Sequence, residues 1–422
     1  MNYRIMVFFH IIILFLPYSL MEKKIKHTKI KLHHGIVTLS PLAKKIIDTP
    51  EFRRLHEIKQ LGLVYRVFPP AKHSRGDHSL GVYYLVGRYL EYLCKYTPID
   101  ERTKEILKIS GLVHDIGHNA FSHLFDHQFA KKLGLPDHEE RGTKIFKDMV
   151  EKYKLDFSTQ EVELICAIVT GKHCKPYPRW MFQIVCNSFF ELDCDKYEYI
   201  VQDCFHTGVS VPIQLDRIFE ESRISVDGDI IFNRKIYLQI YDIFMSRYRL
   251  HRCCYRSKAV VSCEIMVTKY LNLLFQIPEI IEILKKEEWS FFDDDILKFA
   301  DKLLILKNVN IFGDSSWIVK NEEILKKCSA IKNDIDLRKL PKLISMTNVT
   351  DTSSDKKIED DDPNYKNIVV SMGFCSSKTN PFDNILFFEN DESGTIHHIN
   401  FRDISKLLCH DVNEDIIFRY KL

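Results

Sequence analysis

Histidine is concentrated in one part of this 422-residue chain, where seven of the 18 histidines fall between His73 and His138. The centre of this region is the run GLVHDIGH at 111–118, in which His114 and Asp115 are adjacent within an otherwise apolar segment. A buried His–Asp step needs a compensating charge, and a metal ion supplies one. Imidazole and carboxylate ligands suit Fe, Mn, Zn or Ni rather than calcium. The sequence therefore predicts a transition-metal site.

Two further ligands must come from elsewhere in the chain. His78 stands at the start of a predicted helix, and Asp195 begins a polar helical face that repeats every four residues. A His–Asp pair alone means little, since most such pairs cap helices or lie on the surface. Four residues in the order H…HD…D form the pattern of the HD phosphohydrolases, which is stronger evidence for a metal site. The predicted ligands are His78, His114, Asp115 and Asp195.

The elements that must position these residues are mainly helices. Ser40-Pro41 and Thr49-Pro50 each combine an N-cap residue with a first-turn proline, which is typical of helix starts. Apolar spacing predicts longer helices at 78–96, 101–124, 161–169, 181–202, 235–255 and 260–275.

The C-terminal part of the chain has a different pattern. Asp227-Gly228 predicts a hairpin turn within 218–233, and the acidic stretch at 347–366 predicts an exposed linker. We expect strands at 368–372, 385–388, 396–399 and 416–420, with a helix at 401–408. The expected fold class is mainly α, with a helical HD-domain core and a small C-terminal α+β lobe. The expected divisions are an apolar leader or upstream extension at 1–21, an HD phosphohydrolase domain at 25–275, a helical extension at 276–346, the linker at 347–366, and the lobe at 367–422.

Composition restricts partners and location. Lys and Arg total 60 against 58 Asp and Glu, so net charge gives no case for nucleic acid or membrane binding. The 12 cysteines include no Cys-x-x-Cys pair and predict a reduced, cytoplasmic protein. The apolar run at 5–16 resembles a signal-peptide core, which keeps secretion or anchoring as the alternative, but we expect Met21 to be the start. The lysine- and isoleucine-rich composition is compatible with a viral source and a host-cytoplasmic location.

Several further motifs carry a resemblance to a known family. They are TPEFRRL at 49–55, IKQLG at 58–62, DHSLGV at 77–82, the run at 111–123, the run at 193–203 and NPFD at 380–383. In this order they resemble the dNTP triphosphohydrolase branch of HD proteins, and most closely the HD and C-terminal lobes of animal proteins that also carry a sterile-alpha-motif. The resemblance covers about 32–422. It implies cleavage of a dNTP to deoxynucleoside and intact triphosphate, with Fe, Mn or Zn at the HD site and Mg²⁺ on the triphosphate.

The resemblance also implies roles for individual residues. His123 is the expected acid for the 5′-oxygen, His118 contacts the α-phosphate, and Asp126 and His138 tune the acid. The implied phosphate contacts are Arg75, Lys196, Tyr199 and Arg247. The implied sugar or base contacts are Gln60, Leu61, Asp203 and Tyr255. The alternatives are that Lys196 and Arg247 are solvated surface charges and that both tyrosines are ordinary core aromatics.

Regulation is where the sequence departs from the family. Relatives are activated by guanine nucleotides and dNTPs that hold a tetramer together, and the implied effector contacts here are Asp48, Arg217, Lys235 and Lys258. The arginine expected at 56 is His56, the arginine expected at 233 is Asn233, and Arg256 replaces a glutamine. We therefore expect a homo-oligomer, a dimer or tetramer, with active chemistry and altered control by GTP or dNTP effectors.

Two other functions stay open. One is a different HD reaction, such as that of a 5′-nucleotidase or a phosphodiesterase, although two-metal phosphodiesterases need additional histidine ligands. The other is a non-catalytic HD scaffold that binds nucleotide or single-stranded nucleic acid through aromatic and basic side chains. The complete ligand set argues against the scaffold.

Overall fold

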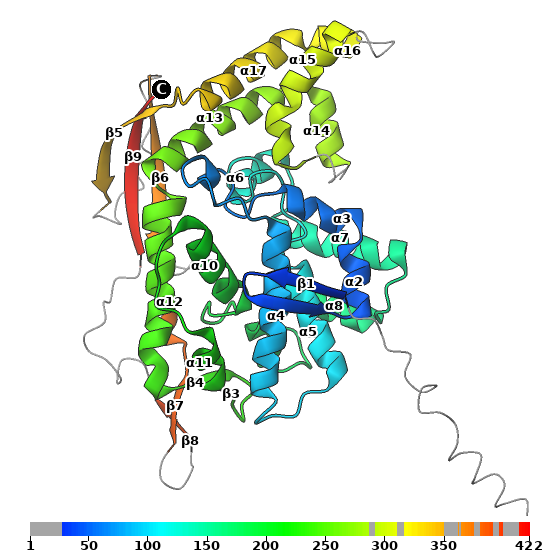
Figure 1. Ribbon diagram of the computed structural model, residues 1–422, viewed down its shortest axis with the longest axis vertical. Coiled ribbons are helices and arrows are strands. Elements are labelled where there is room, and N and C mark those ends of the chain that lie inside the picture. Colours follow the sequence, from blue (N-terminus) through cyan, green and yellow to red (C-terminus); the bar gives the residue numbers. More distant parts are fainter. Residues whose placement is uncertain are drawn as a thin grey trace, which may run out of the picture.

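The computed structural model describes residues 28–286, 292–309, 316–349, 362, 364–374, 380–390, 396–399 and 413–422 (Figure 1). Most of this chain is helical, in agreement with a mainly α fold. The predicted leader at 1–21 and the predicted helix at 401–408 lie outside the described residues. Within the described part, no single helix is long and apolar enough to cross a membrane. Two consecutive helices, Lys258–Leu274 and Pro278–Lys285, reach that length and hydropathy only when taken together, and the chain bends by 99° between them.

The chain begins with a hairpin and two short helices. Strands β1 (Thr28–Leu32) and β2 (Gly35–Leu39) pair in antiparallel register. Helices α2 (Pro41–Ile47) and α3 (Pro50–Arg53) follow. Their caps are Ser40 and Thr49, whose side chains accept hydrogen bonds from the third following backbone N–H. The two predicted helix starts are confirmed.

The core of the HD region is built around helix α4 (Arg75–Leu93) and the two helices that pack against it. Helix α4 packs against α5 (Glu101–Val113) and α10 (Cys194–Thr207). The remaining elements here are η2 (Arg54–Glu57), η3 (Val64–Arg66), α6 (His123–Phe125), η4 (Asp126–Ala130), η5 (Lys131–Leu133), α7 (His138–Tyr153), α8 (Thr159–Val169), α9 (Trp180–Gln183), α11 (Leu215–Glu220), η6 (Arg234–Ile236), α12 (Tyr237–Leu250) and η7 (His251–Tyr255).

Two predicted helices are interrupted. The helix expected at 101–124 ends at Val113, and the chain turns through 114–122 before α6. Gly117 lies within this turn and packs closely against the start of α7, because a Cβ at this position would lie 2.0 Å from the carbonyl oxygen of His138. The helix expected at 181–202 is divided into α9 and α10, and Asp193 caps the second of them. Apolar spacing does not reveal such breaks, since they depend on contacts between segments that are distant in sequence.

A second helical layer follows the HD region. It contains α13 (Lys258–Leu274), α14 (Pro278–Lys285), η9 (Asp294–Lys298), α15 (Phe299–Val309), α16 (Ser316–Lys320) and α17 (Glu322–Asp336). Helices α13 and α17 pack together, and their buried side chains form a core with Phe121, Phe125 and Phe129. This core therefore extends beneath the segment that follows the His–Asp pair.

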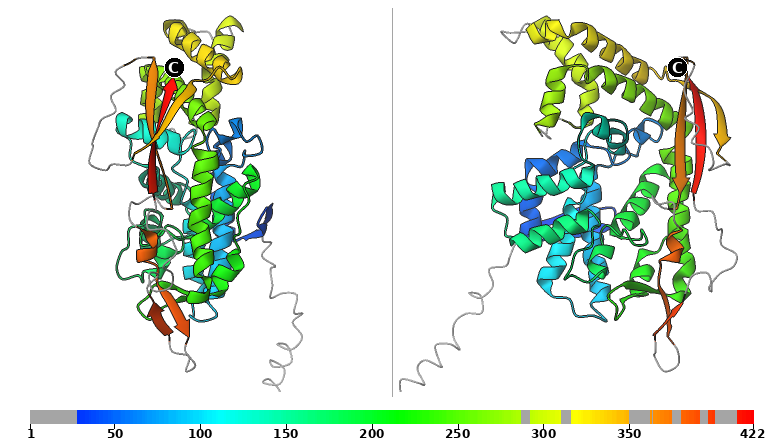
Figure 2. Two further views of the ribbon diagram at one scale, coloured as in Figure 1. Left: turned by 90° about the vertical axis from the view of Figure 1, so that its left-hand side faces the viewer. Right: turned by 180° about the vertical axis from the view of Figure 1, so that it is seen from behind.

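The C-terminal strands are shared between two sheets. Strands β5 (Lys342–Asn348), β9 (Asn413–Lys421) and β6 (Tyr365–Gly373) form an antiparallel sheet in that order. Strands β7 (Phe387–Asn390) and β8 (Ile396–Ile399) extend the hairpin of β3 (Ser222–Ile224) and β4 (Ile230–Asn233). Figures 1 and 2 show these two sheets at opposite ends of the same side of the molecule, along α12 and α13.

The strands expected in the small lobe at 367–422 do not all pair with one another. Strand β7 pairs in parallel with β4 of the HD region, through Phe232 with Phe387 and Asn233 with Phe388. Strand β5 lies in the segment expected to be helical, 276–346, and continues to Asn348, inside the expected linker. The β pattern of these segments was visible in the sequence, but their pairing partners were not, because pairing depends on long-range contacts.

Candidate active site

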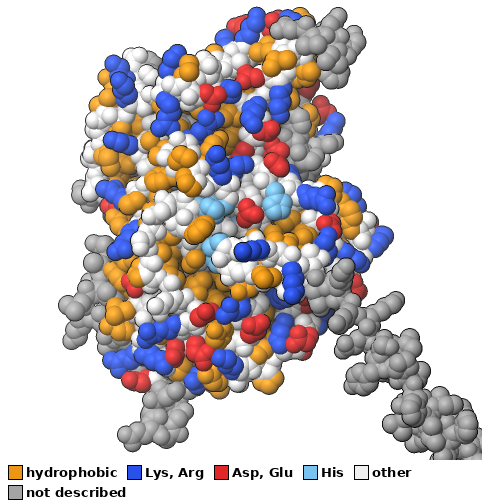
Figure 3. Space-filling model, in the orientation of Figure 1, with side chains coloured by type: hydrophobic (Ala, Val, Ile, Leu, Met, Phe, Trp, Pro, Cys, Tyr) orange, Lys and Arg blue, Asp and Glu red, His pale blue; other side chains and the backbone are white. Residues whose placement is uncertain are grey.

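A cleft of 1670 Å³ opens between the HD helices and the second layer. Its lining comes from the loops around 60–64 and 121–128, from α10, from the end of α12 with η7, from α13 and from β6. Figure 3 shows pale blue histidines gathered around acidic side chains near the middle of the visible face. The polar chemistry predicted from the sequence therefore lies in one place.

The four predicted metal ligands come together at the floor of this cleft. Asp195 Oδ1 lies 2.9 Å from His78 Nε2 and 3.4 Å from His114 Nε2. The Asp115 carboxylate lies 3.6 Å from His78 Nε2 and 3.5 Å from His114 Nε2. Bonds of about 2.0–2.2 Å to one ion place neighbouring ligand atoms roughly 3 to 3.5 Å apart. The spacing therefore fits a single divalent ion.

Hydrogen bonds on the far side of each imidazole support this fit. His114 Nδ1 donates to the carbonyl oxygen of Gly111 (2.8 Å), and His78 Nδ1 donates to the carboxylate of Glu198. The two Nε2 atoms then face each other at 3.2 Å, each with a lone pair in the neutral ring. Burial opposes a charge on His78, but Glu198 and Asp195 outweigh it and raise the pKa of His78 to about 10. The donor set attracts positive charge, which a metal ion provides.

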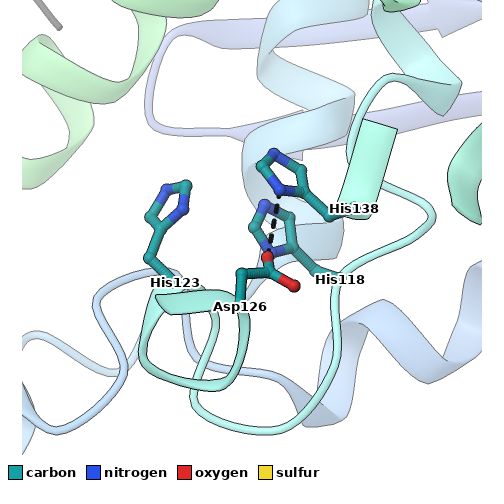
Figure 4. A group of neighbouring side chains, drawn as sticks. All are labelled: His118, His123, Asp126 and His138. Atoms are coloured by element: carbon teal, nitrogen blue, oxygen red, sulfur yellow. Dashed lines mark ion pairs between the residues drawn. The ribbon is translucent and has the colours of Figure 1, made fainter. Parts of the chain in front are cut away.

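A second group of predicted residues lies directly beside the ligands. His118 Nε2 is 3.3 Å from Asp115 Oδ1, and the His118 ring stacks on His138 with centroids 3.9 Å apart. Asp126 Oδ2 lies 3.0 Å from His138 Nδ1, an ion-pair distance, and the His123 ring centroid lies 4.9 Å from that of His118 (Figure 4). The structure thus brings together the expected acid His123, the two residues expected to tune it, Asp126 and His138, and the expected α-phosphate contact His118. Their ligand atoms also lie within 4.8 Å of one another, which is close enough for a metal ion.

Protonation in this group is controlled by the surroundings. The His123 side chain is exposed within the cleft, where protein atoms surround it on several sides. Burial by these atoms, followed by the positive charge of Arg75, lowers the pKa of His123 well below its ordinary value. Burial, followed by Arg75, lowers the pKa of His118 in the same way. Both rings are therefore neutral near pH 7 in the substrate-free protein.

Two buried arginines hold the turn that follows the His–Asp pair. Arg54 donates to the carbonyl oxygens of His118 (2.6 Å) and Ile116 (2.8 Å). Arg141 donates to the carbonyl oxygen of Gly117 (3.0 Å) and to Asp126 Oδ1 (2.6 Å). A buried carbonyl needs a partner, and these arginines replace the partners that a continuing helix would have supplied.

Arg75, expected to contact phosphate, is held by protein atoms around the predicted metal site. It is buried, and it donates to Asp115 Oδ2 (2.6 Å), to Ser122 Oγ (3.0 Å) and to the carbonyl oxygen of Gln60 (3.3 Å). Its guanidinium therefore orients a predicted metal ligand and the adjoining loops, while it also lines the cleft.

All the expected substrate contacts line the same cleft: Gln60, Leu61, Arg75, Lys196, Tyr199, Asp203, Arg247 and Tyr255. Asp203 accepts from Tyr255 Oη and, at 2.7 Å, from His73 Nε2. Lys196 is buried, and although burial opposes its charge, Asp193 raises the pKa of Lys196. The idea that Lys196 and Arg247 are solvated surface charges is wrong, because both are buried.

The expected effector contacts are dispersed, and none of the four lines the cleft. Asp48 follows α2 and pairs with Lys44 and Arg53. Lys235 pairs with Glu221 at 2.5 Å. Arg217 lies on α11 and Lys258 begins α13.

Sequence reasoning missed three residues that hold the site together: Arg54, Arg141 and Glu198. Glu198 could have been found, because it follows Asp195 by three residues and so lies next to it on the same side of the helix. The two arginines carried no such signal, since nothing local distinguishes a buried arginine from the many solvated ones.

Comparison with known proteins gives a consistent result. Residues 75–199 match the model of the HD domain family. An HD domain-containing protein of Acanthamoeba polyphaga mimivirus is 29% identical over 87% of this chain and 87% of its own. A SAMHD1 homolog of Dictyostelium discoideum, described as a deoxynucleoside triphosphate triphosphohydrolase, is 33% identical over 56% of this chain and 46% of its own.

The deoxynucleoside triphosphate triphosphohydrolase SAMHD1 of Homo sapiens is 30% identical over 92% of this chain and 69% of its own. The likeness is therefore not confined to the HD segment but runs through the second helical layer and the C-terminal strands. Together with the HD match and the four converging ligands, it shows that this chain is an HD-domain hydrolase and belongs to the SAMHD1 family.

Proposed function

We propose that the protein hydrolyses dNTPs to deoxynucleoside and triphosphate. The observation that carries this proposal is the convergence of His78, His114, Asp115 and Asp195 beside the His118–His138 group, at the floor of a cleft. The names of the SAMHD1 relatives support the same substrate class.

The reaction needs a nucleophile, charge neutralisation and a proton for the leaving 5′-oxygen. When bound, a divalent ion at the four ligands activates water and neutralises phosphate charge. His123 protonates the 5′-oxygen as its bond to the α-phosphorus breaks. The negative charge of the bound triphosphate opposes the pKa-lowering surroundings of His123, so the ring gains its proton when substrate arrives. Asp126 orients His138, whose ring stacks on His118.

The opposite side of the cleft suits the rest of the nucleotide. Lys196 and Arg247 supply positive charge for the triphosphate, with Mg²⁺ arriving on the substrate. Asp203 is held on both oxygens, by His73 and Tyr255, so its position is restricted. We propose that this rigid arrangement with Gln60 and Leu61 contacts the sugar and excludes a 2′-hydroxyl.

A second candidate function is a two-metal phosphohydrolase, such as a phosphodiesterase. One observation favours it: the ligand atoms of His118, His123, Asp126 and His138 lie within 4.8 Å of one another. Against it, Asp126 is already paired with Arg141 and His138. The two functions differ in their products and in the number of ions bound.

The experiment incubates the metal-loaded protein with each dNTP and analyses the products by chromatography. Deoxynucleoside with triphosphate supports the proposal, whereas monophosphate with pyrophosphate supports the second candidate. Asp115→Asn should abolish turnover and metal uptake, because the site loses a charged ligand that Arg75 holds in place. Full activity in this variant would contradict the assigned site.

A further inference from the structure

A buried carboxylate lies behind the predicted metal ligands. Glu198, on α10, has a fully buried side chain, and each of its oxygens accepts a hydrogen bond from a histidine. Oε2 accepts from His78 Nδ1, and Oε1 accepts from His34 Nε2 at 2.8 Å. A buried carboxylate is costly without such partners, so both bonds are needed to keep it in place.

The space for this carboxylate is made by a glycine in α4. A Cβ on Gly81 would lie 2.2 Å from Glu198 Oε1 and 2.6 Å from its Cδ, closer than atoms can approach. Any other residue at 81 would therefore displace the carboxylate. Gly81 lies three residues after His78, so the helix that carries the metal ligand also carries the space for the residue behind it.

The third member comes from the other end of the HD region. His34 lies in the turn between β1 and β2, and its side chain is 7% exposed. The next residue, Gly35, has φ +136°, a backbone conformation that L side chains rarely adopt. The turn conformation therefore brings the His34 ring onto Glu198, across 164 residues of sequence.

We infer that Glu198 is a positioning residue for the metal ligand His78, and that the β1–β2 hairpin takes part in metal binding through His34. The bond to Nδ1 fixes the ring orientation and leaves Nε2 free to face the ion. Carboxylates behind metal-ligating histidines act in this way and also strengthen the ligand. This inference rests on the metal site of the proposed function.

Metal binding to the intact protein is the direct test. The protein is stripped with a chelator and titrated with Mn²⁺ or Co²⁺, and the visible absorption of Co²⁺ reports on the ligand geometry. Glu198→Gln should weaken binding about 10- to 100-fold and change the Co²⁺ spectrum. Glu161→Gln, which alters a carboxylate on the distant helix α8, is the matched control and should leave both unchanged.

Two variants at His34 separate positioning from general stability. His34→Ala removes the donor to Glu198 and should weaken metal binding less than Glu198→Gln does. His34→Gln keeps an N–H donor and should restore most of the affinity. Gly81→Ala should reproduce the Glu198→Gln spectrum, because the new methyl group displaces the carboxylate without changing any hydrogen-bonding residue.

Thermal unfolding of the metal-free proteins identifies variants that do not fold. If Glu198→Gln does not fold, the metal affinities of the His34 variants test the inference. Wild-type affinity and an unchanged Co²⁺ spectrum in folded Glu198→Gln, or in folded His34→Ala, would overturn the inference and leave the proposed function intact. A wild-type protein that takes up no metal would overturn the proposed function and this inference with it.

Discussion

His123 is the residue on which the proposed chemistry depends most directly. It lies beside His118, it reaches solvent at the cleft, and its surroundings lower the pKa of its ring. In the proposed reaction it delivers the proton to the 5′-oxygen, whereas His118 and His138 stay in the ring stack next to the ligands. Its contribution should therefore appear in turnover and not in metal binding.

His123→Asn tests this role. We expect kcat to fall about 10²- to 10⁴-fold, the usual contribution of a general acid, while the metal content stays at the wild-type level. Steady-state kinetics and metal analysis of the same preparation provide the measurement. His127→Asn, on the same segment and also lining the cleft, is the control and should retain most activity. Equal losses of kcat in the two variants would contradict the assignment of His123 as the general acid.

At the scale of elements, the turn at 114–122 is the feature that makes the site. Helix α5 ends at Val113, directly before His114. Both members of the His–Asp pair therefore lie at the start of the turn, and both line the cleft. Close packing of the turn against α7 keeps it there, through Arg141 and the contact between Gly117 and His138.

Gly117→Ala should disrupt this turn. The added Cβ would lie 2.0 Å from the His138 carbonyl oxygen and 2.4 Å from the Gly142 nitrogen, and backbone atoms cannot move aside as a flexible side chain can. We expect destabilisation by about 1–3 kcal/mol or more, together with loss of activity. Urea unfolding measures the first. Gly87→Ala is the control, because the nearest neighbour of the new Cβ would be the flexible Lys108 side chain at 3.5 Å. We expect this variant to lose much less unfolding free energy than Gly117→Ala.

The junction of α5 and α8 gives a pH-dependent prediction. Glu161 accepts from Arg102 Nε at 2.5 Å and from the backbone N–H of Ser158 at 2.7 Å, and these contacts, Arg102 first, lower the pKa of Glu161 to about 2. A lowered pKa means that the stabilisation is complete above about pH 4.5, the ordinary value, and is lost as the pH falls towards 2.

The corresponding variant is Glu161→Gln. Its free energy of unfolding should be below that of the wild type by a constant amount between pH 7 and 5, and the difference should narrow from pH 4.5 downwards. Denaturant unfolding at pH 7, 5, 4 and 3 measures this difference. The exposed Glu163 on the same helix offers the control Glu163→Gln, for which we expect no such trend. A difference that does not change with pH would show that the ion pair contributes nothing.

At the scale of the whole molecule, the residues expected to bind effector nucleotides bear on regulation. His56 stands where the family resemblance predicts an arginine, and its ring packs against Gly76 at the start of α4. Asp48, the expected guanine contact, is engaged by Lys44 and Arg53. We propose that the protein forms a cytoplasmic homo-oligomer in which effector nucleotides have less influence than the family resemblance implies.

We expect dNTP hydrolysis to proceed without GTP, because His56 and Asn233 replace two expected arginines, and Asp48 and Lys235 are paired with other side chains of the protein. Initial rates measured across a series of GTP concentrations, with subunit number determined by mass photometry, provide the test. His56→Arg restores the expected side chain and should increase the response to GTP. Strict dependence of the wild-type rate on GTP would contradict the prediction.

The sequence by itself predicted the metal ligands and much of the local structure. Ligand types and their order predicted the set of His78, His114, Asp115 and Asp195, and the caps Ser40 and Thr49 predicted helix starts, because both depend on residue identity and short spacing. Family membership followed from motifs that are equally local.

Tertiary structure decided what supports that chemistry. Glu198 reaches His78 from another helix, Arg54 and Arg141 donate to carbonyls of a turn whose sequence predicted a helix, and β7 pairs with β4 of the HD region. Each depends on contacts between segments far apart in the chain, and local patterns do not contain the close approaches, such as that at Gly117, that make these contacts possible.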